Sequence, residues 1–280
     1  MRPTLNIIGC GKVGKVLARL WAAAGVFDVQ DIVNRSAGST RAAVDFIGSG
    51  RPAAGIAAMR PAAVWLIGTP DDQIGRACDA LAAAGVLVPG AVVFHCSGAL
   101  PSTVLHSAAE AGAAVASVHP IRSFASPAQS ADGFAGTWCG IEGQPAAVAQ
   151  LSSAFAAIGA RVVPIDAEFK TLYHSAAVFA SNYLVTLLDV AMQAYEKSGV
   201  PRDAALQLME PLVRGAVDNV FRLGTADALT GPIARGDTAT VLRQYRAVSA
   251  WDRRIGALYK QLGKLTAAIA ARKKGPARPG

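Results

Sequence analysis

The sequence predicts an α/β domain with a doubly wound, mostly parallel sheet, followed by an all-α domain. Up to about residue 166, short apolar runs alternate with helical patterns, which is typical of a parallel sheet with right-handed crossovers. Beyond that point, helical patterns continue to Arg272 without a convincing strand. We therefore expect a sheet domain over 1–166, a helical domain over 167–272 and a frayed basic tail over 273–280.

A glycine-rich turn follows the first expected strand, residues 5–8. Residues 5–14 read LNIIGCGKVG, and a helical pattern starts directly afterwards. In this arrangement one glycine makes a tight turn, a second lets the backbone approach a pyrophosphate, and a third lets the helix pack on the strand. A purely structural turn is the alternative, but the flanking strand and helix favour a Rossmann-type dinucleotide site. The residues expected to bind the cofactor here are Gly9, Gly11, Lys12, Val13 and Gly14.

The end of the second expected strand, residues 29–33, indicates which dinucleotide binds. An acidic residue there would hold the ribose 2′-hydroxyl of NAD, whereas an arginine accommodates the 2′-phosphate of NADP. Asp31 lies inside the strand, too early to reach the ribose. The strand runs out into Asn34, Arg35 and Ser36, which can all hydrogen-bond a phosphate. We therefore expect NADP(H), with a solvated turn arginine as the alternative for Arg35.

Further strands are expected at 63–67, 92–95, 114–118, 137–141 and 162–164. Ligands of open α/β sheets bind beyond the carboxyl ends of the strands, so the residues after each strand are candidates. Thr69 and Pro70 follow the first of these strands and are expected beside the cofactor. Ser97 follows the next one, near the expected nicotinamide, and His119 ends the strand after that as a candidate substrate ligand. A purely structural histidine is the alternative.

One long helical pattern, from residue 168 to 197, opens the second domain. Lys170 and His174 are four positions apart and share a helix face, and Asn182 lies near the same row. The other residues are mostly apolar, so we expect the helix to be largely buried, with this polar row facing a cleft between the domains. These three residues are the catalytic candidates, and a solvent-facing stripe is the alternative.

A loop punctuated by glycine and proline, residues 229–237, follows in the helical domain. Asp237 is a good N-cap for a helix that runs to about Ser249. Free amides at that helix start, together with Gly231 and Arg235, are expected to bind a substrate carboxylate. A plain linker is the alternative.

The composition limits the class of protein. Of the residues, 52% are apolar, and the net charge of +8 is scattered except in the tail, so we expect no nucleic-acid partner. The four cysteines, Cys10, Cys78, Cys96 and Cys139, have no metal-type spacing. We expect free thiols, no metal and a cytoplasmic protein. Charges or glycines interrupt the apolar stretches, so neither a secretory signal nor a membrane-spanning helix is expected.

Several motifs taken together resemble one family. They are HCSGAL (95–100), HP (119–120), LYHSAAVFASNYL (172–184) and LTGPIARGD (229–237). The chain is similar to bacterial proteins that join a Rossmann-like domain to a helical domain of unassigned function and are described as NADP oxidoreductases. More distantly it resembles pyrroline-carboxylate reductases, ketopantoate reductases and β-hydroxyacid dehydrogenases. The last group carries a catalytic lysine, which Lys170 matches, but His174 stands where that group has an asparagine.

These observations and the resemblance lead to one expected function. It is the NADPH-dependent reduction of a small oxo or imino acid in the interdomain cleft, with Lys170 or His174 as the proton donor. A non-catalytic NADP-binding sensor or assembly protein is one alternative. An enzyme that uses His119 as prephenate and arogenate dehydrogenases do is another. The apolar helices and the resemblance also predict a homodimer formed through the helical domain.

Overall fold

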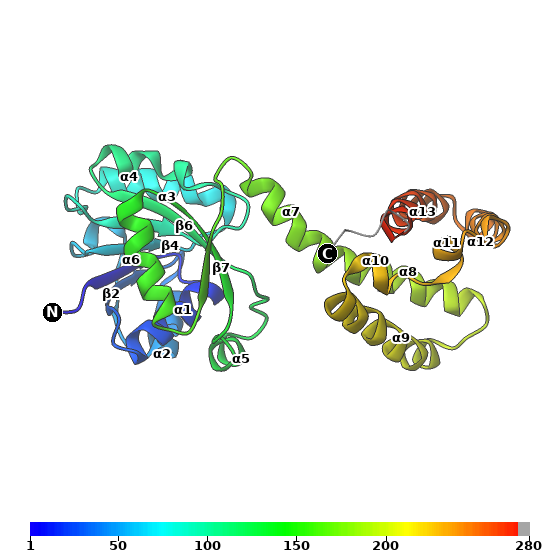
Figure 1. Ribbon diagram of the computed structural model, residues 1–280. Helices are drawn as coiled ribbons and strands as arrows, with labels where there is room; N and C mark the ends of the chain where they lie inside the picture. The colour runs from blue at the N-terminus through cyan, green and yellow to red at the C-terminus, as the bar shows by residue number, and fades with distance from the viewer. Residues whose placement is uncertain (274–280) are drawn as a thin grey trace. The chain divides into compact units, whose positions relative to one another are not determined.

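The structure is a computed structural model that describes residues 1–273, so the expected tail lies outside the described residues except for Lys273. The chain divides into two compact units, Met1–Ala180 and a second unit that begins at Ser181. Each unit is described by itself, and Figure 1 labels the elements.

The first unit is built on an eight-stranded sheet in the order β3-β2-β1-β4-β5-β6-β7-β8. All neighbouring strands are parallel except β6 and β7, which confirms the doubly wound, mostly parallel sheet. The strand bounds are β1 Thr4–Ile8, β2 Asp28–Val33, β3 Arg51–Pro52, β4 Val64–Ile67, β5 Val92–His95, β6 Ala114–Pro120, β7 Trp138–Gly143 and β8 Arg161–Pro164. The strand order reverses between β1 and β4, where ligands of such sheets bind.

Helices cover both faces of this sheet. They are α1 Lys12–Ala23, α2 Ala37–Ile47, α3 Asp71–Ala83, α4 His106–Glu110, α5 Pro127–Asp132 and α6 Pro145–Ala156, with 3₁₀ turns at Ile56–Ala58 and Ser102–Leu105. Helix α7, Lys170–Ala180, follows the last strand and buries only Lys170. One core joins the sheet to α1, α2 and α6, and its centre is Trp21, whose indole N–H donates to the Ala154 carbonyl at 2.9 Å. A second core joins the sheet to α3 and α4. The sheet is therefore buried on both sides.

The boundary between the units differs from the expected one. They divide between Ala180 and Ser181 rather than near residue 166. The first turn of α7, the first helix after the last strand, belongs to the first unit, because Lys170 is buried there and bonds Glu142. In the sequence, strand and helix patterns give way to a purely helical pattern near residue 166. That change does not show that the start of α7 packs on the first unit.

The second unit is all helical within the described residues. It contains α8 Asn182–Lys197, α9 Arg202–Leu223, α10 Thr225–Ala228, α11 Gly231–Arg235, α12 Thr238–Trp251 and α13 Arg253–Lys273. Asp237 caps α12 by accepting the Thr240 amide at 3.0 Å, so this predicted N-cap is confirmed. Pairs α8–α9 and α12–α13 pack on each other, and α10 and α11 pack on α13.

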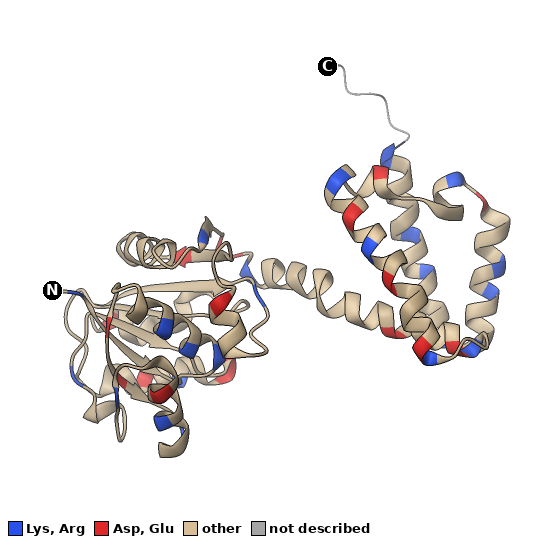
Figure 2. Ribbon diagram, turned by 90° about the horizontal axis from the view of Figure 1, so that it is seen from below, with Lys and Arg blue, Asp and Glu red and all other residues tan. Residues whose placement is uncertain are grey.

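The helical stretch Lys170–Lys197 differs from the expectation. It has a mean hydropathy of 1.4 over an 18-residue window in which none of the residues is buried. Length and composition alone would let it cross a membrane, and the view by charge shows a long stretch of this helix without charged residues (Figure 2). Leu172 and Val185 are each 67% exposed. The prediction that this helix is largely buried is therefore wrong for the single chain.

Candidate functional site

The turn between β1 and α1 has the backbone geometry that a dinucleotide needs. Gly9 has φ +80°, and a Cβ atom there would lie 2.6 Å from the Thr69 side chain. Gly11 has no atom closer than 4.0 Å to such a Cβ, so space opens in front of it. Gly11 is also the N-cap of α1 and makes no side-chain capping bond, which leaves the first amides of the helix for a phosphate. A Cβ atom at Gly14 would lie 3.4 Å from Cys10 Sγ, so this glycine stands at a close contact between the helix and the turn.

A large cavity lies beyond the ends of β1, β2 and β4. Its volume is about 1090 Å³. Its lining includes most residues expected to bind the cofactor, namely Gly9, Gly11, Asn34, Arg35, Ser36, Thr69 and Pro70. A smaller cavity of about 160 Å³ is lined by Val13, Gly14, Thr69 and Ser97 among others. Lys12 is exposed at the start of α1 and lines neither cavity, so its contact with the cofactor stays a prediction.

The polar residues after β2 have different roles. The Asn34 side chain accepts the Cys10 amide and donates to the Ser39 carbonyl at 3.0 Å, so it braces the glycine turn. Ser36 caps α2 by accepting the Ser39 amide at 3.2 Å. Arg35 has no hydrogen-bond or ion-pair partner among residues 1–273 and lines the large cavity. Only the arginine is therefore fully available to an anion.

Asp31 is unavailable for a ribose, as the sequence predicts. It is fully buried, and its carboxylate accepts from Arg51 Nε at 2.6 Å and from Arg60 Nη2 at 2.8 Å. Burial alone raises the pKa of Asp31, but the hydrogen bonds from Arg60 and Arg51 outweigh it and lower the pKa to about 2. The carboxylate thus ties β2 to β3 and to the segment before β4.

Two hydroxyls near the glycine turn behave differently. Thr69 Oγ1 is buried and has no hydrogen-bond partner among the described residues. A buried hydroxyl without a partner is costly, so a ligand group is the natural complement. Ser97 Oγ donates to Asp71 Oδ2 at 2.8 Å and accepts the amides of Ala99 and Leu100. Ser97 therefore shapes the loop after β5, although it also lines the smaller cavity.

Lys170 is not where the sequence analysis expects it. Its side chain is 1% exposed, and Nζ donates to Glu142 Oε1 at 2.9 Å and to Ser117 Oγ. Burial lowers the pKa of Lys170, and the bond to Glu142 opposes that shift. The expectation that Lys170 faces an open cleft is wrong, because its ammonium group is enclosed between β6, β7 and the start of α7.

His119, Tyr173 and His174 form a cluster at the ends of β5, β6 and β7. His119 Nδ1 lies 3.1 Å from the Tyr173 hydroxyl, and the two imidazole rings are 5.6 Å apart. Burial lowers the pKa of His119 to about 4, and the charges of His174 and Lys170 add to this. Burial also raises the pKa of Tyr173 to about 12. The cluster is therefore neutral near pH 7 at His119 and Tyr173.

Two glycines leave the space that the side chains of this cluster occupy. A Cβ atom at Gly98 would lie 2.4 Å from His174 Nδ1 and 2.8 Å from His119 Nε2. A Cβ atom at Gly140 would lie 2.5 Å from the Tyr173 hydroxyl. His174 Nδ1 is buried and has no hydrogen-bond partner among the residues that the structure describes. A buried ring nitrogen without a partner is costly, so a ligand group is a natural complement to the His174 ring.

Three candidates belong to the second unit, and their roles stay predictions. Asn182 is the first residue of α8 and is exposed. Gly231 has φ +87° and begins α11, which ends at the exposed Arg235. The expected free amides at the start of α12 are not all free, because the Asp237 carboxylate takes one of them. That bond lowers the pKa of Asp237, and the charge of Arg235 contributes.

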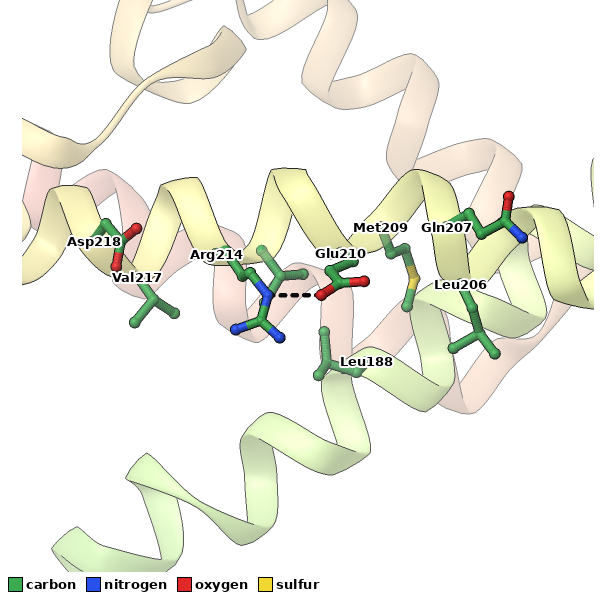
Figure 3. A pocket seen from close by; sticks show the side chains of 9 residues that line it. Leu188, Leu206, Gln207, Met209, Glu210, Arg214, Val217 and Asp218 are labelled. Carbon is green, nitrogen blue, oxygen red and sulfur yellow. Dashed lines mark hydrogen bonds and ion pairs between the residues drawn. The ribbon is translucent and has the colours of Figure 1, made fainter.

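A separate hollow of about 570 Å³ lies between α8 and α9 (Figure 3). Its lining is mostly apolar, with Leu188, Leu206 and Met209 among the residues. The Arg214 guanidinium bonds Glu210 one turn before it at 2.8 Å, as the dashed line marks. The charged residues of its lining are Glu210, Arg214 and Asp218.

Cysteines and metal ligands add little to the site. Cys10, Cys78 and Cys139 are buried thiols, and Cys96 is partly exposed. Burial raises the pKa of Cys96, so its thiol is a poor nucleophile. Over residues 1–273, no group of three or more His, Cys, Asp or Glu side chains could hold a metal ion.

Comparisons with known proteins agree with this architecture. Residues 1–120 match a Rossmann-like domain, and residues 137–266 match DUF2520, a domain of unknown function. No curated protein matches the chain.

Solved structures share the fold over nearly the whole chain. A protein of Thermotoga maritima is 26% identical, with 97% of this chain and 100% of that chain covered and a TM-score of 0.76. A candidate NADP oxidoreductase of Bacteroides fragilis is 21% identical, covers 95% and 98%, and has a TM-score of 0.72. A pyrroline carboxylate reductase of Plasmodium falciparum, solved with NADP bound, is 13% identical, covers 96% and 98%, and has a TM-score of 0.57.

Some residues of the site escaped the sequence analysis. Arg76 on α3 lines the large cavity, and Glu142 on β7 holds Lys170. Gly98 and Tyr173 stand inside motifs that were noticed, but nothing in the sequence assigns them a partner. Glu142 and Gly140 lie on a strand that returns antiparallel to β6, a pairing that no local pattern reveals.

Proposed function

We propose that this chain is a cytoplasmic NADPH-dependent reductase of a small carbonyl or imine compound. The observation that carries the proposal is the cluster of His119, Tyr173 and His174 on the same sheet edge as the glycine turn and Thr69. A dinucleotide at the turn and a proton donor a few strands away are the two components that such a reduction needs. The buried free thiols fit a reducing compartment.

The residues of the large cavity fit NADP(H). Gly9 and Gly11 would let the backbone approach the pyrophosphate, and the unpartnered Thr69 hydroxyl would lie beside the cofactor. Arg35 and Arg76 are two cations in the lining that could hold the 2′-phosphate, while Asp31 is committed to other arginines. When bound, the nicotinamide supplies the hydride.

His174 is the proposed proton donor. Its Nδ1 is packed against Gly98, so Nε2, on the other side of the ring, is the nitrogen that would face a substrate, and a proton given from the ring would be replaced from solvent. His119 contacts the same glycine and hydrogen-bonds Tyr173, which would orient the substrate oxygen or nitrogen. Because burial keeps His119 neutral, it would accept or donate a hydrogen bond without repelling a cationic imine.

A carboxylate on the substrate remains part of the proposal. Arg235 and Gly231 would bind it, and Asn182 would help to orient the substrate, from the second unit. Arg235 has no described hydrogen bond that would occupy its guanidinium group, which supports this role. The exposed apolar face of α7 and α8 supports a homodimer formed through the helical region.

The test is a substrate screen that follows NADPH absorbance at 340 nm. The panel would contain 2-oxo acids and cyclic imines, with and without a carboxylate, so that the class and the carboxylate are judged separately. We expect consumption of NADPH with one class, and a loss of about 10²–10⁴-fold in kcat in His174→Ala with little change in NADPH affinity. Binding of NADPH without turnover of any compound would favour the sensor alternative.

A further inference from the structure

The proposed mechanism leaves one buried ion pair unused. Lys170 and Glu142 have side chains that are 1% and 4% exposed, and their N–O distance is 2.9 Å. Glu142 also accepts the Ser102 amide at 2.8 Å and the Ser102 hydroxyl at 2.6 Å. Lys170 also donates to the Ser117 hydroxyl. The pair thus joins the first turn of α7 to β6, to β7 and to the turn after the loop that carries Gly98.

The same helix turn carries the catalytic candidates. Tyr173 and His174 follow Lys170 by three and four positions, so the three side chains share one face of α7. Each fits a narrow place on the strand ends, Tyr173 against Gly140 and His174 against Gly98. A small sliding or rotation of α7 would therefore separate His174 from His119.

We propose that Lys170 and Glu142 are positioning residues whose ion pair fixes α7, so that His174 and Tyr173 meet His119, and that Lys170 gives no proton to the substrate. This inference rests on the proposed function only in naming His174 as the donor. The ammonium group of Lys170 bonds Glu142 and Ser117, and its side chain is 1% exposed, so no open surface lets a substrate reach it. The geometry therefore assigns the lysine a different role from the one that the resemblance to β-hydroxyacid dehydrogenases implies.

Replacing Lys170 and Glu142 by uncharged residues distinguishes a positioning role of Lys170 from a role as proton donor. Lys170→Met leaves the Glu142 carboxylate buried without a cation, and Glu142→Gln leaves the ammonium without its counter-ion. The double variant removes both charges, and its amide oxygen still accepts the Ser102 amide. A buried pair replaced as a whole is commonly tolerated, whereas removal of one partner is strongly destabilising. Matched controls are the same changes at exposed residues, Lys197→Met and Glu168→Gln.

Three readouts are taken on the full chain. They are the thermal unfolding midpoint, the ¹⁵N NMR signals of the His119 and His174 imidazoles over pH, and NADPH oxidation with 2-methyl-1-pyrroline and other members of the panel. His119 is faced by Lys170, Tyr173 and His174 from α7 and by Asp71 from α3. We expect each single variant to lower the midpoint by roughly 10 °C and to move both imidazole signals. The double variant should recover most of the midpoint and the neutral tautomers, with turnover within about tenfold of wild type.

Each contrary outcome overturns the inference. Single variants with unchanged midpoints and imidazole signals would show that the pair positions nothing. If the midpoint and the imidazole signals of the double variant changed as much as those of the single variants, charge neutrality at this pair would not be what holds α7 in place. A double variant with wild-type imidazole signals but turnover reduced as far as in Lys170→Met would make Lys170 the donor. Should the wild type turn over no compound, the proposed function fails, and the NMR signals and midpoints still decide the positioning role.

Discussion

At the scale of single residues, the arginines between β2 and the end of α3 are of two kinds. Arg51 and Arg60 neutralise the buried Asp31 carboxylate and are part of the fold. Arg35 and Arg76 line the cavity and have no described partner, so their charge is available to a ligand. Two of these arginines thus stabilise the fold, and the other two are available for binding.

Removing Arg35 or Arg76 tests this division. A charge-assisted hydrogen bond contributes on the order of 1.5–3 kcal/mol, so Arg35→Ala should weaken NADPH roughly 10–100-fold and leave NADH nearly unchanged. Arg76→Ala should weaken NADPH by up to about tenfold. Calorimetric titration with both cofactors measures this, with Arg41→Ala on the exposed side of α2 as the control. Equal affinity of the wild type for NADPH and NADH would refute the role of Arg35.

The glycine under the two histidines offers a second test at this scale. A methyl group at Gly98 would displace both imidazoles, because it would lie within 2.8 Å of each. A displacement of about 1 Å can cost on the order of 10²-fold in rate, so Gly98→Ala should lose about that much turnover and keep its NADPH affinity. Gly38→Ala, where a Cβ meets nothing within 4 Å, is the matched control and should behave like wild type. Full activity of Gly98→Ala would argue against the cluster.

At the scale of elements, strand ends were more predictable than helix docking. The strand 92–95 is found where its apolar run predicts it, since turn residues bracket the run. Strand β3 was missed because two residues, one of them proline, carry no periodicity. The sequence predicts α7 as a helix, but its attachment depends on Glu142. A glutamate followed by a glycine is typical of a solvent-exposed position, so the sequence does not predict its burial. Contacts between distant segments are set by topology, which local patterns do not contain.

A buried histidine at the end of β5 gives the first unit a pH-dependent stability. His95 is fully buried and accepts the Ser97 amide on Nδ1 at 3.1 Å, so it is neutral in the fold. Burial lowers its pKa from 6.5 to about 4, with the charge of Lys170 contributing. As the pH falls, His95 therefore becomes protonated in the unfolded chain before it does so in the folded chain. The stability of the folded chain relative to the unfolded chain decreases for this reason between pH 6.5 and pH 4.

Denaturant unfolding at several pH values measures this loss. The free energy of unfolding should fall by up to about 1.4 kcal/mol per pH unit for each such imidazole, and His119 adds to the effect. His95→Gln should have a shallower pH dependence by one proton, although its stability at pH 7 should also be lower. A His95→Gln slope as steep as that of the wild type would contradict the assignment.

At the scale of the whole molecule, the single chain leaves most of the apolar helical stretch Lys170–Lys197 exposed. Residues 171–188 contain no charged side chain, and many of them are exposed in the single chain. Such a surface is larger than soluble monomers usually carry. A second copy of the chain supplies a matching apolar surface and closes by symmetry, whereas a membrane would leave the polar histidine cluster beside lipid.

We therefore predict a particle of twice the 28.7 kDa of one chain by light scattering at micromolar concentration. Val185→Lys places a charge on the apolar face of α8 and should give monomers or a Kd raised at least about 100-fold. Val88→Lys is the control, because Val88 is also exposed but lies in the first unit. A wild type that is monomeric in detergent-free buffer, or one that is recovered only with vesicles, would refute the dimer.

The docking of α7 also has a consequence for how this chain could be cut or recombined. A fragment that ends at residue 166, where the sequence pattern changes, would keep Glu142 but lose the lysine that neutralises it. A fragment that ends at Ala180 keeps the pair, the Tyr173 contact and His174. Exchange of the helical part between relatives should thus succeed at residue 180 and fail at residue 166. The natural module that can be inherited or transplanted is the sheet together with the helix that leaves it.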